Sequence, residues 1–400
     1  MMTSIQRLSL AAACLAASAV FAPHALAHPF MISHGYTQCA SCHSDPSGGG
    51  LLTAYGRAQG GLILAKRWDD AKTEADDEKA AARGDFLFGA VKLPEEVLLG
   101  GDFRGAVLGQ TAASQPLDAR FILMTADVGA GVIVDRFHAQ GTLGFASDGA
   151  FAATVVGNQD ARMVSRTHFV GVDFGEDHQF LLRAGRMNLP FGLRSIEHTL
   201  WVRSSTRTDI NAAQQHGVAL SYSGDSLRGE AMFIGGNFQI SPDEYRERGY
   251  SAFLEVAPSE HAAIGVSSLL THAATDLTLQ VPLWRHAHGL FARYSPASYV
   301  VLSAEGDFLV FSEPFRNAYG FAAYTQADFE PTQGLHLLGT LEAQDKDAKQ
   351  LGVSLGAGAA LAWFFAPHAD LRLDALLQSL SVPGTRVLGE AVVVQAHVYL

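Results

Sequence analysis

The residues with the clearest chemical meaning are Cys39, Cys42 and His43, which form the sequence Cys39-Ala40-Ser41-Cys42-His43. The C-x-x-C-H spacing is the signature of covalent haem attachment, in which two thiols add to the vinyl groups of one haem. The next residue then lies beneath the iron, so His43 is predicted as the proximal axial ligand through one imidazole nitrogen. The motif predicts one covalently bound haem c.

Two other sites use closely spaced cysteines. A zinc site needs further Cys and His at finger spacing, and a C-x-x-C redox motif needs a βαβ surround. The sequence has neither around Cys39 and Cys42, and its third cysteine, Cys14, lies near the amino terminus. Haem attachment is therefore the preferred interpretation.

The second axial ligand of the iron is less determined. His34 precedes Cys39 closely and is the first choice, which would give a bis-His iron of fairly low potential, whereas Met31 would raise the potential. His28 also precedes the motif, and no Met occurs between His43 and Met124. The alternative is that His34 is a polar loop residue and that water or a residue of the remaining chain takes the sixth position.

The first 27 residues read as a secretory signal peptide. Arg7 supplies the positive region, residues 8–21 the apolar region and Ala25-Leu26-Ala27 an A-x-A cleavage site. A lipoprotein signal ending at Cys14 is the less favoured alternative. Cleavage after Ala27 would leave Cys39 and Cys42 as the cysteines of the exported protein.

Composition divides the rest of the chain into three parts. Residues 28–68 form the haem segment, residues 69–83 a charged stretch read as a solvated linker with a frayed helix as the alternative, and residues 84–400 a strand-rich domain. Within the haem segment, residues 51–67 have helical spacing that several glycines weaken. A segment this short cannot enclose a haem, so the lumen of the following domain is expected to cover it.

The strand-rich domain alternates between two kinds of residue. Segments of about ten residues place apolar side chains at one parity and small or polar ones at the other, which is typical of transmembrane β-barrels. Two segments show the alternation clearly. In the first, one face has Leu335, Leu337, Gly339 and Leu341, and the other face has His336, Leu338, Thr340 and Glu342. In the second, one face has Val392, Val394, Ala396, Val398 and Leu400, and the other face has Gln395, His397 and Tyr399. The sequence predicts an all-β fold: a transmembrane antiparallel barrel of about 16 strands, with the haem segment as a plug. A soluble β-sandwich is the alternative.

Charge restricts the partners. The net charge is −12 and no basic block occurs, which argues against binding of nucleic acid through its phosphates. The long loop predicted at residues 188–214 does contain Arg194, Arg203 and Arg207, which could fold inward and hydrogen-bond haem propionates. An ordinary surface loop with scattered charge is the favoured reading of these arginines.

With these motifs in place, the chain resembles the fused outer-membrane cytochrome-porins, including those of iron-oxidising bacteria. The likeness rests on Cys39, Cys42 and His43, on the strand-rich domain and on residues 185–192, which look like a porin strand end and loop. The resemblance implies a location in the outer membrane of a Gram-negative bacterium. It also implies a haem segment in the barrel lumen or at its periplasmic mouth and, in the best-known branch, ferrous iron as the outside electron donor.

Three functions are compatible with these motifs and segments. The preferred one is electron transfer between an extracellular donor or acceptor, such as iron or another metal, and a periplasmic c-type cytochrome, from a barrel surrounded by outer-membrane lipid. The second is a diffusion porin whose haem segment is a structural or redox-gating plug. The third is a haem enzyme such as a peroxidase, which needs an open sixth position.

Overall fold

The structure is a computed structural model that describes residues 29–46, 48–68, 73–112, 118–145, 163–195, 197, 199–210, 212–239 and 242–400. The predicted signal peptide, His28 and the beginning of the predicted linker lie outside these residues. No helix among the residues just given is long and apolar enough to cross a bilayer.

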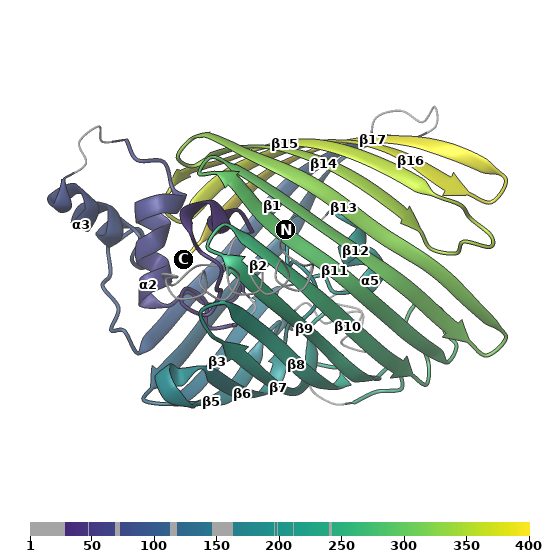
Figure 1. Ribbon diagram of the computed structural model, residues 1–400, viewed down its shortest axis with the longest axis horizontal. Helices are drawn as coiled ribbons and strands as arrows, with labels where there is room; N and C mark the ends of the chain where they lie inside the picture. The colour runs from purple at the N-terminus through teal and green to yellow at the C-terminus, as the bar shows by residue number, and fades with distance from the viewer. Residues whose placement is uncertain are drawn as a thin grey trace, which may run out of the picture.

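Antiparallel strands form one closed sheet (Figure 1). Apart from the short β4, each strand pairs with the next along the chain, β3 pairs with β5, and β1 pairs with both β2 and β17, which closes the barrel. The strands are β1 (Val97–Ala112), β2 (Asp118–Val134), β3 (Phe137–Phe145), β4 (Met163–Val164), β5 (His168–Phe174), β6 (Phe180–Met187), β7 (Gln215–Ser223), β8 (Leu227–Gly236), β9 (Glu247–Ser259), β10 (Ala262–Ala273), β11 (Leu283–Ala297), β12 (Val300–Glu313), β13 (Arg316–Thr332), β14 (Leu335–Asp345), β15 (Ser354–Ala366), β16 (Ala369–Val382) and β17 (Thr385–Tyr399).

The short segment β4 does not add a position to the barrel. Both β4 and β5 pair with β3, Val164 opposite Gly144 and His168 opposite Gly141. They are two parts of one interrupted strand, so sixteen strands surround the lumen. The predicted all-β antiparallel barrel of about 16 strands is confirmed.

The two faces of the barrel have opposite chemistry. Large apolar side chains are exposed on the outer face, among them Phe121, Val170, Phe233, Ile264, Leu290, Phe308, Leu341, Leu373 and Val394. Charged side chains are buried on the inner face, among them Arg183, Arg228, Glu255, Arg285, Arg293, Glu305, Asp328 and Glu342. An apolar outside around a polar inside is the reverse of a soluble β-sandwich and suits a wall that faces lipid.

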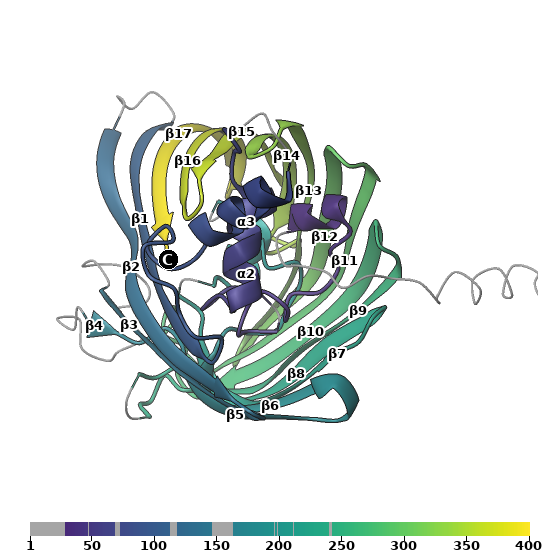
Figure 2. The same cartoon turned by 90° about the vertical axis from the view of Figure 1, so that its left-hand side faces the viewer.

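The amino-terminal segment lies at the end of the barrel where the strands are joined by short turns. In Figure 2 this end faces the viewer, with α2 and α3 across the opening. The 3₁₀-helix η1 (Pro29–His34) contacts β11 and β12. Ile32 packs against Ala257, Ala263 and Val301, which lie near the turns of this end. The longer connections, including residues 188–214, join strands at the opposite end.

Helices in this segment follow local sequence signals. Thr53 caps α2 (Ala54–Gln59), which continues as the π-helix η2 (Gly60–Leu64) where two glycines occur. Thr73 and Asp76 form a capping box that starts α3 (Glu74–Arg83). Most of the predicted linker is therefore helical, as in the alternative considered for it, because the capping box offsets the lack of an apolar stripe.

Candidate functional site

The cysteine motif is a single turn of chain followed by a short ladder. The amides of Cys42 and His43 both donate to the carbonyl of Cys39, at 3.2 and 3.1 Å. Ser44 N then donates to Leu51 O and Thr53 N to Cys42 O, both at 2.9 Å, so His43 and Leu52 form an isolated β-bridge. These backbone hydrogen bonds fix the positions of Cys42 and His43 independently of side-chain packing.

Glycine makes possible the turn between the two segments that the His43–Leu52 bridge joins. Gly48, Gly49 and Gly50 have φ of 97°, 86° and 71°, the left-handed region that residues with a Cβ rarely adopt. Gly56 in α2 allows a second close approach, because a Cβ there would lie 2.4 Å from the carbonyl oxygen of Cys42. These glycines therefore permit the turn, and α2 packs directly on the motif.

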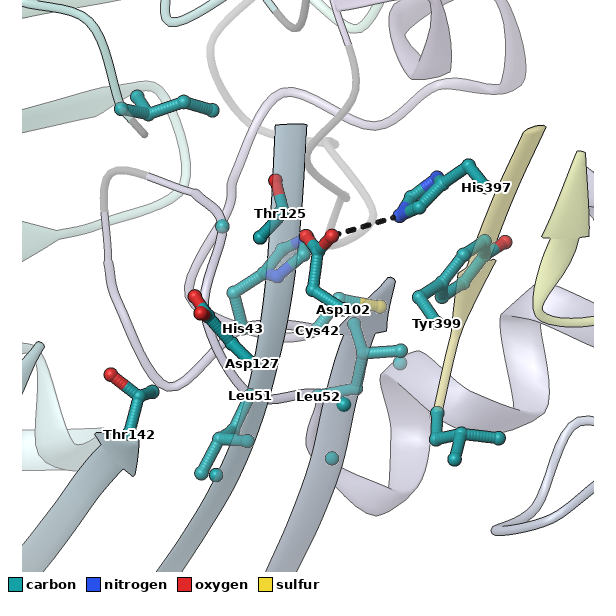
Figure 3. Close-up of a pocket in the computed structure, with 18 of the residues that line it drawn as sticks. Cys42, His43, Leu51, Leu52, Asp102, Thr125, Asp127, Thr142, His397 and Tyr399 are labelled. Atoms are coloured by element: carbon teal, nitrogen blue, oxygen red, sulfur yellow. Dashed lines mark ion pairs between the residues drawn. The ribbon is translucent and has the colours of Figure 1, made fainter. Parts of the chain in front are cut away.

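A cavity of about 250 Å³ adjoins the motif (Figure 3). Its lining comes from the amino-terminal segment and from the barrel wall of β1, β2, β16 and β17, with Cys42 and His43 on one side and Asp102, His397 and Tyr399 on the other. Leu51 fits into a notch of the wall, since a Cβ at Gly100 or Gly129 would lie 2.7 or 2.8 Å from its Cδ2. A group held by Cys42 and His43 would therefore lie in this cavity.

The two cysteine side chains face different surroundings. Both are free thiols and are buried, Cys39 at 4% and Cys42 at 6% exposure. Cys42 lines the cavity, and burial raises the pKa of its thiol. The Cys39 Sγ instead accepts a hydrogen bond from Arg228 Nη1 at 2.7 Å. A second thioether through Cys39 requires this side chain to turn from Arg228 toward the cavity.

His43 has the properties of a ligand residue. Its Nδ1 is buried and has no hydrogen-bond partner among the described residues. Burial lowers the pKa of His43 to about 4, against a smaller raising effect of Asp45. The ring is therefore neutral at neutral pH, which is the form that binds a metal. The residues at the cavity fit a covalently held haem through Cys42 and His43, with Cys39 completing the motif after rotation.

The two predicted distal residues lie in different places. Met31 is 4% exposed, packs against Cys42 and lines the cavity. His34 is half-buried, with its Nε2 3.5 Å from Glu330 Oε2 of β13. Glu330 Oε1 also lies 3.8 Å from His336 Nε2. The structure therefore brings Met31 to the cavity beside His43 and His34 to the barrel wall.

Asp45 ties this site to the barrel. One of its carboxylate oxygens lies 3.2 Å from Arg183 Nη1 of β6, and the other 3.2 Å from Arg194 Nη1 of the long loop. Asn188 Nδ2 donates to the same carboxylate at 3.3 Å. Arg183 also pairs with Glu230 of β8. Because Asp45 follows His43 by two residues, this buried network fixes the motif in the lumen.

The long loop between β6 and β7 folds into the lumen. Its apolar side chains pack on the inner faces of β5 to β13, in a cluster of Phe169, Met187, Leu189, Phe191, Leu193, Leu200, Val202, Ala219, Met232, Ile234, Phe253, Leu269, Ala287, Phe291, Leu309, Ala322 and Tyr324. Carboxylates of the barrel wall accept hydrogen bonds from the backbone of the loop. Glu305 accepts from Leu193 N at 2.8 Å, and Glu342 accepts from Trp201 N at 2.6 Å. The helix α5 (Trp201–Thr206) within the loop contacts β12 to β14. The reading as an ordinary surface loop is wrong, because these apolar residues fill the lumen.

The arginines of this loop have carboxylate partners. Arg194 pairs with Asp45 and donates to Gly48 O at 3.0 Å, next to the motif. Arg203 pairs with Asp209, and Arg207 with Asp276. Of the three, Arg194 reaches the glycine turn, and a propionate-binding role for it stays a prediction. His198 lies outside the described residues.

The polar cluster on the cavity wall was not recognised in the sequence. His397 Nδ1 lies 2.8 Å from Asp370 Oδ2, and its Nε2 lies 3.4 Å from Asp102 Oδ1. Asp127 pairs with Arg166 at 2.6 Å. The available signal was strand parity, which places His397 and Tyr399 on the polar face of the last strand. Nothing in the sequence indicated that this face meets His43.

Comparisons with known proteins give a fold and no family. No family model matches the chain, and no curated protein matches it. Among solved structures, the chain is similar to outer-membrane OmpT of Vibrio cholerae (13% identity, TM-score 0.56, covering 78% of this chain and 100% of that one). It is similar to the outer-membrane channel DcaP of Acinetobacter baumannii (12% identity, TM-score 0.55, covering 76% of this chain and 97% of that one). It is also similar to an anion-selective porin of Comamonas acidovorans (13% identity, TM-score 0.55, covering 75% of this chain and 99% of that one). At this identity the likeness establishes the porin-type barrel.

Proposed function

We propose that this protein is an outer-membrane electron-transfer barrel in which one covalent haem c, held by Cys39, Cys42 and His43, sits in the lumen at the short-turn end. The observation that carries the proposal is the C-x-x-C-H motif inside a barrel, with Cys42 and His43 on a cavity. The apolar outer face and the porin-type fold support the outer-membrane location. Short turns face the periplasm in such barrels, which supports a position of the motif at the periplasmic mouth.

The residues divide the work at this site. Cys42 and Cys39 would anchor the haem, His43 would bind its iron, and Met31, which lines the same cavity, would supply a further ligand. When bound, the haem supplies a one-electron redox centre. Asp45 holds the motif through Arg183 and Arg194, and Leu51 seals it against the wall at Gly100. An extracellular donor or acceptor, with iron or another metal as candidates, and a periplasmic c-type cytochrome complete the proposed route.

A diffusion porin is the second candidate function, and the comparisons favour it, since the similar structures include a channel and an anion-selective porin. The packing of the lumen favours electron transfer instead. The long loop covers the inner faces of β5 to β13, and the amino-terminal segment lies over part of the remaining wall. A lumen filled in this way leaves less room for passive diffusion.

Liposomes distinguish the two functions. Each contains a redox dye, and an external reductant is added to the wild type and to the Cys39→Ala/Cys42→Ala double variant. We expect dye reduction with the wild type and its loss in the double variant, because both thioether anchors are gone while every strand is intact. Efflux of a small sugar, measured in parallel, is expected to be low in the wild type. Dye reduction no faster than in empty liposomes, together with rapid sugar efflux, would identify a porin.

A further inference from the structure

A row of aromatic and imidazole rings connects the cavity to the surface of the short-turn end. His397 and Tyr399 line the cavity, with ring centroids 5.0 Å apart. Tyr399 lies 5.4 Å from His368, and His368 lies 5.8 Å from Phe88. His368 is fully buried in the turn between β15 and β16, whereas Phe88 is 46% exposed. The row therefore begins across the cavity from His43 and ends at the surface.

The loop that carries Phe88 is held in an unfavourable conformation. Leu87 and Phe88 have φ of 53° and 60°, the left-handed region that is strained for residues with a Cβ. Hydrogen bonds from Gly89 N to Asp85 O (2.9 Å) and from His368 Nε2 to Gly84 O (2.6 Å) maintain it. The conformation exposes Leu87, Phe88 and Val91 instead of burying them. Stability does not explain such a loop, so a binding role is the natural reading.

The surroundings of this loop are mainly acidic. α3 precedes it, and the short segment to β1 follows it. In residues 73–96, leaving aside Asp85 and Asp77, which pair with Arg57 and Arg67, the acids Glu74, Asp76, Glu78, Glu95 and Glu96 outnumber the bases Lys79, Arg83 and Lys92. An apolar tip beside an excess of acids fits a protein whose apolar contact patch has a basic rim. The same acids disfavour insertion of the tip among anionic lipids.

We propose that residues 85–91, here called the tip, dock a soluble electron carrier with a basic face, and that the row His397, Tyr399, His368 and Phe88 is the path of the electron. The inference rests on the proposed function, which assigns a haem to His43. One electron passes: either the haem iron or the carrier's redox centre is oxidised, and the other is reduced. No bond forms or breaks. The rate of electron tunnelling falls steeply with distance, so a row of ring contacts from the cavity to the surface favours this route.

The test measures electron exchange between the haem-loaded protein in nanodiscs and mitochondrial-type cytochrome c, a basic haem protein, as the probe. Phe88→Ala is expected to lower the second-order rate constant about tenfold, the effect of losing one interface anchor. Phe315→Ala is the matched control, because Phe315 is fully exposed at the opposite end of the barrel. Reduction by dithionite, a small reagent, is expected to stay unchanged in both variants. The wild-type rate is expected to fall as salt rises.

Three outcomes separate the possibilities. A preparation without haem absorbance contradicts the proposed function itself. Haem absorbance with equal rates for Phe88→Ala, Phe315→Ala and the wild type overturns the docking proposal alone. Phe88→Trp is expected to retain the wild-type rate, which guards against misfolding of the tip in Phe88→Ala. If brominated lipids quench the added tryptophan emission of Phe88→Trp, the tip contacts the membrane and the proposal is wrong.

Discussion

Met31 and His34 were both candidates for the sixth ligand, and their surroundings separate them. The Met31 side chain contacts Cys42 in the cavity, whereas His34 is near Glu330 on the wall. The Glu330 carboxylate, 3.5 Å from His34 Nε2, competes with a metal ion for that nitrogen. At the residue scale, the geometry favours a His43 and Met31 pair.

Replacement of each candidate gives a direct test. Met31→Ala is expected to convert a low-spin ferric haem to a high-spin or water-bound form and to lower the redox potential, because thioether ligation raises it. His34→Ala is expected to leave both properties close to the wild type. Absorption spectra and potentiometric titration measure them. The opposite pattern, with a spectral change only in His34→Ala, would return the assignment to His34.

At the scale of elements, the Asp45 carboxylate is one of the contacts that hold the haem segment in the lumen. Asp45→Asn removes the charged partner of Arg194 at the motif and leaves Arg183 with Glu230, and losing one member of a buried pair costs about 3–5 kcal/mol. We expect the segment to detach at a lower urea concentration, while the barrel stays folded. The Soret band reports the segment and heat-modifiable migration on gels reports the barrel. Glu78→Gln, which removes an exposed charge on α3, is the control and is expected to change neither.

Strands were predictable from the sequence because each face of the barrel has one chemistry. The expected faces of β14 and β17 are correct, with Leu341 and Val394 outside and Glu342 and Gln395 inside. Boundaries were harder to place. For example, β2 ends at Val134 and the chain turns at Asp135 and Arg136. Asp135 is a common turn residue, but the glycine that follows it in the usual Asp-Gly hairpin is replaced by Arg136.

The cavity could be predicted only in part. Cys42 and His43 could be selected as candidate haem-binding residues because the C-x-x-C-H spacing is a local pattern. Their neighbours Asp102 and His397 come from β1 and β17, which meet because the barrel closes. The inward course of the long loop likewise depends on Glu305 and Glu342, far away in the sequence. Contacts of this kind are set by barrel closure and are invisible to a pattern of neighbouring residues.

For the whole molecule, the apolar outer face predicts sensitivity to charge. Leu290 on β11 is 65% exposed, and Leu290→Arg is expected to destabilise the barrel by about 2–4 kcal/mol if the position lies near the bilayer centre. Urea unfolding in phospholipid vesicles measures the change. Phe315→Arg, between β12 and β13 beyond the strand ends, is expected to have little effect. Equal effects of the two substitutions would contradict a lipid-facing wall at Leu290.

The burial of both cysteines has a consequence for the order of events in biogenesis. Cys39 and Cys42 are enclosed by a wall that is complete once β1 pairs with β17. An enzyme that joins the proposed haem to these thiols would find them covered afterwards. Under the proposed function, attachment is therefore expected to precede closure of that seam, so that the barrel matures around a segment that already carries the haem. Export, modification and membrane insertion would then follow in that sequence, and a delay in the second step would hold back the third.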